Sequence, residues 1–331
     1  MVKVAVIGTG FIGSVHARNI ARHPGAELVA VSDVNVELAK KIAATTGAKA
    51  VANVAEIFAN QDIQAVLIAT STDTHVDYLK RAADAGKAIY CEKPIGLDYK
   101  EAEQAVSAVR AAGVPVMLGF NRRFDASHAA VKEAIDRGDI GKVEIVQLTS
   151  RGPKPPPISY VKVSGGQLRD QTIHFFDLLR WLTKDEPVEV YTIGASLVDP
   201  AIGQAGDVDT SIVSIRMASG ALCQIDSSRR AAYGYDERVE VFGSEGMVES
   251  SRQSFRGFSL YKGGQILKDG LHPGWFERIE GSYFAAIDAF LNSLEKGTPP
   301  SPSLEDGLRA QLIADKATES MRSGQAIKIA G

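Results

Sequence analysis

Short apolar runs alternate with amphipathic stretches along the first third of the chain. Because a strand of a parallel sheet is covered on both faces, such runs predict buried strands. The apolar spacing between them predicts helices, the last with Asp98 as N-cap and Gly113 as its stop. The predicted strands are Val2–Ile7, Glu27–Ser32, Ala65–Ala69, Ala88–Cys91 and Val116–Gly119, with helices near 37–46, 75–85 and 99–112. This alternation predicts an α/β fold, a doubly wound parallel sheet of the Rossmann type.

After Gly119 the pattern changes to a run of strands with few helices. A large, mostly antiparallel open sheet in an α+β domain is therefore expected. The chain divides, on this prediction, into domains 1–120 and 121–331. Strands are predicted at 143–151, 188–197, 209–217, 221–228, 238–243 and 246–250, and helices near 127–137, 171–182, 276–294 and 304–322. Alternation at 211–216 and 222–226 leaves the open face partly apolar, which predicts a homo-oligomer.

A glycine-rich loop follows the first strand directly. Gly8, Gly10 and Gly13 form G-x-G-x-x-G before a segment that suits a helix. In such a loop the first glycine permits a tight turn, the second lets a pyrophosphate approach the backbone, and the third lets helix and strand pack closely. The helix N-terminus then offers N–H groups to the phosphates.

Asp33 ends the second predicted strand, 20 residues after Gly13. A carboxylate there accepts hydrogen bonds from the ribose of NAD and repels the 2′-phosphate of NADP. No Arg or Lys occurs in Ser32-Asp33-Val34-Asn35 to compensate for that phosphate. The sequence therefore predicts NAD as the cofactor.

Composition narrows the classes of function. The net charge of −3 gives no electrostatic case for nucleic acid or an anionic membrane as a partner. Cys91 and Cys223 are the only cysteines, with no spacing typical of a metal site or a disulfide framework. The first strand begins at residue 2 and no apolar run reaches the length of a membrane span. We expect a cytoplasmic enzyme without a metal.

Two segments carry candidate catalytic chemistry. Lys93 follows the strand 88–91, where ligands of parallel sheets bind, although position alone also allows a solvated charge. If residues 171–182 are helical, Asp170 and His174 stand four residues apart on one face, and a carboxylate beside an imidazole suits a general base. The alternative is that Asp170 only caps the helix and His174 is a packed core residue.

The loop Thr70-Ser71-Thr72-Asp73-Thr74-His75 follows the strand 65–69. Its small polar residues suit a loop passing under the nicotinamide ribose. Thr74 as an N-cap and His75 as a surface residue of the first helical turn remain the alternative.

These motifs together resemble the glucose-fructose oxidoreductase/inositol dehydrogenase/rhizopine catabolism (Gfo/Idh/MocA) family over nearly the whole chain. The resemblance rests on GTGFIG, the Thr/Ser loop with His75, Glu92-Lys93-Pro94 and Asp170-x-x-x-His174. Stretches 119–125, 160–166 and 233–236 are similar to inositol 2-dehydrogenases. One departure is Gln167-Leu168-Arg169, where many relatives have a glycine run ending in Gly-Leu, and it concerns the shape of the substrate wall.

The resemblance implies an NAD-linked oxidation of a polyol, myo-inositol to its 2-keto product, by a homotetramer. It implies Lys93, Asp170 and His174 as the catalytic set, with His174 as base. The alternatives are another polyol or sugar as substrate, such as scyllo-inositol or an aldose, or a non-catalytic sensor that binds NAD and a sugar. The implied cofactor residues are Gly8, Gly10, Phe11, Ile12, Gly13, Asp33, Thr70, Ser71, His75, Glu92 and Lys93. The candidate substrate residues are Asn121, Arg122, Arg123, Tyr160, Tyr235 and Tyr283.

Overall fold

The structure, a computed structural model, describes residues 1–329. The chain forms two compact units, Met1–Asn121 with Ser282–Arg309, and Arg122–Gly281 with Ala310–Gly331. The expected division at residue 120 does not include the stretch Ser282–Arg309, which belongs to the first unit. Residues 282–309 return to the first unit because the end of one helix and the start of the next pack there rather than against the second sheet.

The first unit is built on a six-stranded parallel sheet of order β3-β2-β1-β4-β5-β6. Its strands are β1 Val2–Ile7, β2 Ala26–Ser32, β3 Lys49–Val51, β4 Ala65–Ile68, β5 Ala88–Cys91 and β6 Val116–Leu118. This is the predicted Rossmann sheet, and the order reverses between β1 and β4. Ligands of such sheets bind at that reversal, beyond the carboxyl ends of the strands.

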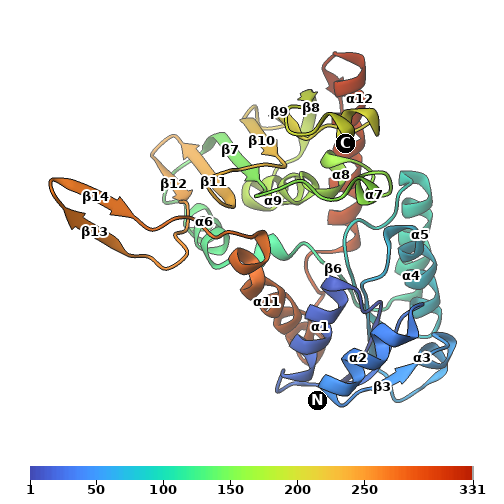
Figure 1. The fold of residues 1–331 in the computed structure, drawn as a ribbon. Coiled ribbons are helices and arrows are strands. Elements are labelled where there is room, and N and C mark those ends of the chain that lie inside the picture. Colours follow the sequence, from blue (N-terminus) through green and yellow to red (C-terminus); the bar gives the residue numbers. More distant parts are fainter. Residues whose placement is uncertain (330–331) are drawn as a thin grey trace. The chain divides into compact units, whose positions relative to one another are not determined.

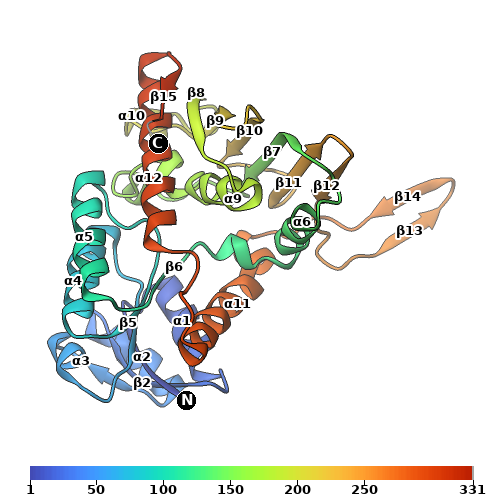
Figure 2. The ribbon, with the colours of Figure 1, turned by 180° about the vertical axis from the view of Figure 1, so that it is seen from behind.

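The helices of this unit follow the strands in sequence, and α4 and α5 lie side by side (Figure 2). They are α1 Phe11–Ala21, α2 Val36–Thr46, α3 Ala55–Ala59, α4 His75–Asp84 and α5 Tyr99–Ala112, with a 3₁₀ turn at Thr72–Thr74. The predicted caps of α5 are confirmed. Asp98 Oδ1 accepts a hydrogen bond from Glu101 N at 2.9 Å, and Gly113 adopts φ 70°. The short elements β3 and α3 were not predicted.

The second unit holds a seven-stranded sheet of order β12-β11-β7-β10-β9-β8-β15. All neighbouring pairs are antiparallel except β7 and β10. Its strands are β7 Val143–Arg151, β8 Pro187–Ala195, β9 Thr210–Met217, β10 Leu222–Ser228, β11 Asp236–Gly243, β12 Gly246–Ser250 and β15 Ile327–Lys328. The predicted, mostly antiparallel sheet is therefore present, with one parallel pair that was not predicted.

The helices of the second unit are mostly short. They are α6 Ala126–Arg137, α7 Ile158–Val161, α8 Gln167–Asp170, α9 Ile173–Thr183 and α10 Pro200–Gln204, with a 3₁₀ turn at Asn121–Phe124 leading in. Two long helices, α11 Trp275–Lys296 and α12 Leu304–Ser323, each contribute to both units. Helix α10 interrupts what the sequence suggested was an unbroken run of strands.

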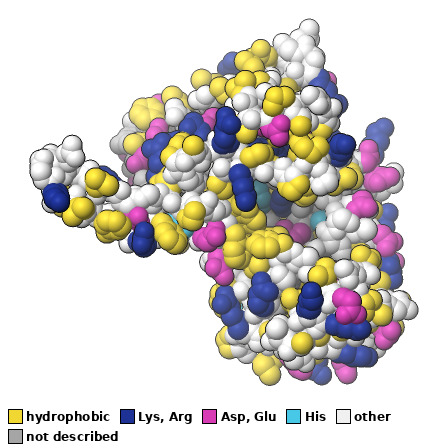
Figure 3. Space-filling model, in the orientation of Figure 1, with side chains coloured by type: hydrophobic (Ala, Val, Ile, Leu, Met, Phe, Trp, Pro, Cys, Tyr) yellow, Lys and Arg dark blue, Asp and Glu magenta, His cyan; other side chains and the backbone are white. Residues whose placement is uncertain are grey.

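A hairpin of β13 Ser259–Lys262 and β14 Gln265–Lys268 extends away from the sheet of the second unit (Figure 1). Every residue of its two strands is exposed. Hydrophobic side chains are visible along it (Figure 3). The large hydrophobic residues of its strands are Leu260, Tyr261, Ile266 and Leu267, and all four are exposed. No strand or helix was predicted for this segment of the chain.

One face of the seven-stranded sheet carries an apolar row. Leu222, Ile145, Phe242 and Met247 are consecutive cross-strand partners on β10, β7, β11 and β12, and all four side chains are exposed. The alternation of apolar and polar residues in the sequence predicted that the open face of this sheet is partly apolar.

Candidate active site

The glycine loop has the geometry that its spacing predicts. Gly8 adopts φ +90°, and a Cβ on it would lie 2.5 Å from Ala69 O at the end of β4. A Cβ on Gly13 would lie 1.9 Å from Gly8 O, so only glycine allows α1 to pack this close to β1. Around Gly10, in contrast, a Cβ would meet nothing within 4 Å. The open space therefore lies at the glycine that a pyrophosphate is expected to approach.

Helix α1 begins directly at this space. Ser14 N donates to Gly10 O at 2.9 Å, so helical bonding starts at Gly10 and the N–H groups of the first turn point to the loop. Phe11, in that turn, has an exposed side chain. The residues present therefore fit a bound dinucleotide, with phosphates at the helix N-terminus.

Asp33 is tied to the same loop. Its Oδ2 accepts from Thr9 N at 2.6 Å and from Thr9 Oγ1 at 3.0 Å, and its Oδ1 accepts from Asn35 N at 2.8 Å. The carboxylate is only half-buried, so it keeps access to solvent. Thr9, which lies inside the glycine motif and was not singled out from sequence, fixes the orientation of Asp33.

His75 connects the Thr70 loop to the segment after β5. Its Nδ1 lies 2.7 Å from Pro94 O and its Nε2 lies 3.1 Å from Thr70 O. The side chain is buried, which lowers the pKa of the imidazole. The alternative of a surface histidine is therefore wrong. Thr70 Oγ1 and Thr74 Oγ1 are 2.6 Å apart, which closes the loop further.

Glu92 and Lys93 follow β5 at the carboxyl edge of the first sheet. Glu92 is buried and Lys93 is half-buried. Glu92 Oε1 lies 2.7 Å from Nε2 of His16, a fully buried histidine on α1. His16 was not identified from sequence, because nothing local connects it to a residue so far along the chain.

Asp170 lies in the second unit, at the end of α8. Its Oδ1 accepts from Tyr160 OH at 2.8 Å, and its Oδ2 lies 3.1 Å from Nη1 of Arg229. Arg229 is buried and also lies 3.6 Å from Asp207 Oδ2, while Asp207 Oδ1 accepts from Gln167 N at the start of α8. Arg229 therefore links both ends of this short helix. Arg229 was not predicted as a site residue, because it follows β10, far from Asp170 along the chain.

His174 lies on α9 and is buried. The helix expected near 171–182 is α9, Ile173–Thr183, whereas Asp170 ends a separate short helix, α8, which was not predicted. α8 ends at Asp170 and α9 begins at Ile173, because the chain turns between them, with Thr172 N bonded to Gln167 O at 3.0 Å. The spacing of four residues therefore does not describe one regular helical face.

Most candidate substrate residues are buried in the cores of their units. Arg123 makes two hydrogen bonds to Asp177, and Arg122 Nε donates to Glu237 Oε2 at 3.0 Å. Tyr235 OH also donates to Glu237. Burial opposes ionisation of Glu237, yet the charge of Arg122 holds its pKa below the ordinary value.

The remaining candidates differ from one another. Tyr283 is buried in the first unit, where its ring packs edge-on against His16 at 5.5 Å. Asn121 is also buried there and donates to Ser282 Oγ at 2.8 Å. Tyr160 is exposed and bonded to Asp170. Of the six, Tyr160 best fits a role in contact with a ligand.

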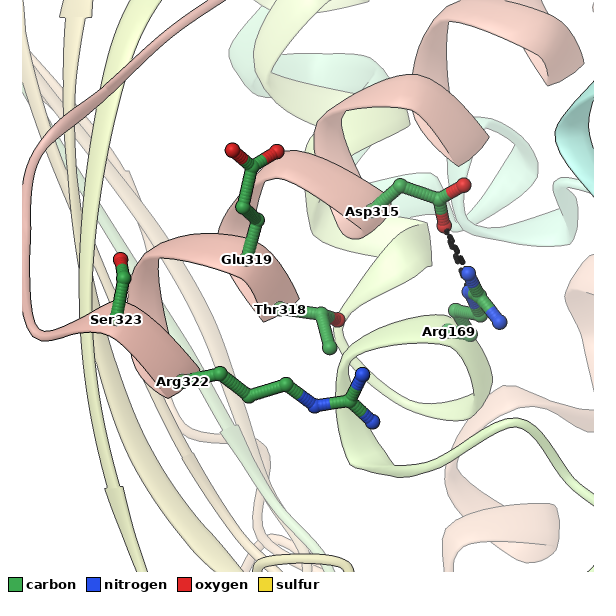
Figure 4. A pocket seen from close by; sticks show the side chains of 6 residues that line it. All are labelled: Arg169, Asp315, Thr318, Glu319, Arg322 and Ser323. Atoms are coloured by element: carbon green, nitrogen blue, oxygen red, sulfur yellow. Dashed lines mark hydrogen bonds and ion pairs between the residues drawn. The ribbon is translucent and has the colours of Figure 1, made fainter.

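A hollow of about 450 Å³ lies between α8 and the second half of α12 (Figure 4). Arg169 points across it to Asp315, with Nε 2.7 Å from Oδ1. This ion pair ties α8 to α12 next to Asp170. The residues that line the hollow therefore hold α8 in place against α12.

Among residues 1–329 no group of three or more His, Cys, Asp or Glu side chains could hold a metal ion. In the same range no helix has the length and hydropathy to span a membrane.

An open glycine loop at the start of α1, with Asp33 held beside it, is typical of the Rossmann unit of a nicotinamide-dependent oxidoreductase. The family model for oxidoreductases with an NAD-binding Rossmann fold matches residues 2–120, and the model for the GFO/IDH/MocA C-terminal domain matches residues 128–249. The chain belongs to the Gfo/Idh/MocA family of NAD-binding oxidoreductases.

The chain is similar to several known dehydrogenases. The inositol 2-dehydrogenase of Rhizobium meliloti is 44% identical over 99% of both chains. The NAD⁺-dependent scyllo-inositol 2-dehydrogenase of Bacillus subtilis is 33% identical over 99% of this chain and 96% of its own. The crystal structure of the myo-inositol dehydrogenase of Lactobacillus casei with NAD(H) and myo-inositol has a TM-score of 0.90 at 26% identity, covering 100% of this chain and 97% of its own.

Proposed function

We propose that this protein oxidises myo-inositol at C2 to the 2-keto inositol, with NAD as hydride acceptor. The observation that carries the proposal is the similarity to an inositol 2-dehydrogenase over the whole length of both chains. Lys93, Asp170 and His174 are the catalytic set that the family resemblance implies.

In the proposed reaction the substrate loses the proton of one hydroxyl group and a hydride from the carbon that bears this hydroxyl. NAD, when bound, supplies the acceptor for that hydride. His174 takes the hydroxyl proton as general base, and Asp170 orients its imidazole. Lys93 donates a hydrogen bond to the reacting oxygen and stabilises its developing negative charge.

The contacts of Asp170 support its positioning role. Tyr160 and Arg229 hold both carboxylate oxygens, so the side chain is fixed before substrate arrives. Tyr160 is also the exposed candidate for a contact with a substrate hydroxyl, whereas Arg122, Arg123 and Tyr235 are buried and paired with carboxylates of the second unit.

The test of this proposal is NADH formation with a panel of polyols and sugars. We expect the highest kcat/KM with myo-inositol. A higher value with scyllo-inositol or an aldose would assign another substrate. NAD binding without turnover of any of them would indicate the non-catalytic sensor.

Asp33 is expected to give a clear preference for NAD over NADP. Replacing Asp33 with alanine removes its charge-assisted hydrogen bonds, each worth about 1.5–3 kcal/mol, and should weaken NAD binding about tenfold or more. The ratio of kcat/KM with NAD to kcat/KM with NADP should fall at the same time. Asp33→Asn is the matched control, since it keeps an oxygen acceptor and removes the charge. Equal or better kcat/KM with NADP in the unmutated enzyme would contradict the prediction.

We also propose a homotetramer in which the open face of the seven-stranded sheet is covered. The row of Leu222, Ile145, Phe242 and Met247 gives that face apolar surface to bury. Light scattering at micromolar concentration should give about four times the chain mass of 35.3 kDa.

Phe242→Asp should shift this assembly to a smaller mass, because it places a charge inside the apolar row. Leu197→Asp is the control, an exposed apolar residue outside that row. A monomer in the unmutated protein would contradict the proposal.

The compartment expected for this enzyme is the cytoplasm. Both Cys91 and Cys223 are buried free thiols, which fits a reducing environment.

A further inference from the structure

His16 lies on α1, the helix that starts at the glycine loop. Its side chain is fully buried, and its Nε2 is 2.7 Å from Glu92 Oε1. The rings of Tyr90 and Tyr283 pack edge-on against the imidazole, with centroids 5.2 and 5.5 Å away. The two aromatic rings therefore hold the imidazole in the orientation that meets Glu92.

The other oxygen of Glu92 faces the backbone of the next residue. Glu92 Oε2 accepts from Lys93 N at 3.3 Å. The carboxylate also lies against Gly119. A Cβ added to Gly119 would be 2.7–2.9 Å from the three atoms of the Glu92 carboxyl group. One buried carboxylate thus connects α1, the segment of Lys93 and the end of β6.

The hydrogen bonding of His16 also indicates its tautomer. Its Nδ1 is buried and meets no hydrogen-bond partner among the described residues. The tautomer with the proton on Nε2 leaves no buried donor unpaired and donates to Glu92. A buried carboxylate that loses such a donor is costly to keep in place.

We propose that His16 is a positioning residue for Lys93, acting through the carboxylate of Glu92. This inference rests on the proposed role of Lys93 at the substrate hydroxyl. Because His16 also belongs to the helix that receives the phosphates, the same contact joins the cofactor-binding helix to the segment of the reacting lysine.

The first test compares two replacements of His16. His16→Phe keeps a ring between Tyr90 and Tyr283 but loses the hydrogen bond, and should lower kcat about tenfold or more. His16→Gln returns an N–H donor and should recover a large part of kcat. NAD affinity, measured by calorimetry, should change much less than kcat in both variants.

A double-mutant cycle with Lys93 separates positioning from general damage. If His16 acts through Lys93, His16→Phe should change the residual rate of the Lys93→Ala enzyme by less than about twofold. His23→Phe is the matched control, since His23 also pairs with a carboxylate, Asp288, with 3.1 Å between Nε2 and Oδ1. It follows the other end of α1 and should leave kcat unchanged. An equal loss from His16→Phe in both backgrounds would overturn the proposal.

Hydrogen exchange gives a readout that does not depend on turnover. In His16→Phe the peptide containing residues 90–97 should exchange about tenfold faster, because the carboxylate that holds Lys93 N is released. In His23→Phe its exchange should be unchanged. Unchanged exchange in His16→Phe would overturn the positioning role, whereas absence of polyol oxidation by the unmutated enzyme would overturn only the proposed function.

Discussion

Replacing His174 with alanine is expected to lower kcat with the best polyol by about 10²–10⁴-fold, the usual cost of losing a general base. The affinity for NAD should barely change, because His174 belongs to α9 of the second unit and the predicted cofactor residues belong to the first. Steady-state kinetics and calorimetric titration with NAD check the two parts. His272→Ala is the control, a partly buried histidine of the same unit that is outside the proposed catalytic set.

Lys93→Ala should cause a loss of similar size, since it removes the charge facing the developing alkoxide. The double variant should lose less than the sum of the two, because both groups act on one proton transfer. Asp170→Asn should cost less than His174→Ala, because it changes only the orientation and basicity of the imidazole. If His174→Ala retained near-normal kcat, the histidine would be a packing residue and another group would be the base.

Gly13→Ala is expected to have the largest effect on folding. The new Cβ would lie 1.9 Å from the carbonyl oxygen of Gly8, a backbone atom that no side-chain rotation can move. We expect a loss of about 3 kcal/mol in the free energy of unfolding, at the upper end of overpacking costs, together with loss of NAD binding. Chemical denaturation and calorimetry measure the two effects.

Gly10→Ala separates binding from stability. Its Cβ would meet nothing within 4 Å, so the thermal midpoint should stay unchanged. The methyl group would occupy the space expected for the pyrophosphate, and NAD affinity should fall by about tenfold or more. Gly281→Ala, on α11 and equally open, is the control for NAD affinity, which it should leave unchanged. Normal NAD affinity in Gly10→Ala would show that the phosphates bind elsewhere.

Much of the first unit was predictable because its signals are local. Strands covered on both faces require continuous apolar runs, so Val2–Ile7 and Ala88–Cys91 were predicted to the residue. The caps of α5 need only Asp98 and Glu101 at its first turn and Gly113 directly after its last. The glycine loop likewise depends on contacts within one strand, turn and helix.

Elements without a local signal were missed. β3 has only three residues, and the hairpin 259–268 has no buried face to impose alternation. Helix α8 was also missed, because four residues are too few to show a helical period in the sequence.

The sequence by itself determined the Rossmann sheet and the glycine loop with Asp33, since their signals lie close together in the chain. Lys93, Asp170 and His174 stay its predicted catalytic set. Only the tertiary structure decided what holds these groups. His16 meets Glu92 across 76 positions, and Arg229 meets Asp170 across 59. Such pairs depend on which strand lies beside which in the folded sheet, and no periodicity along the chain encodes that order.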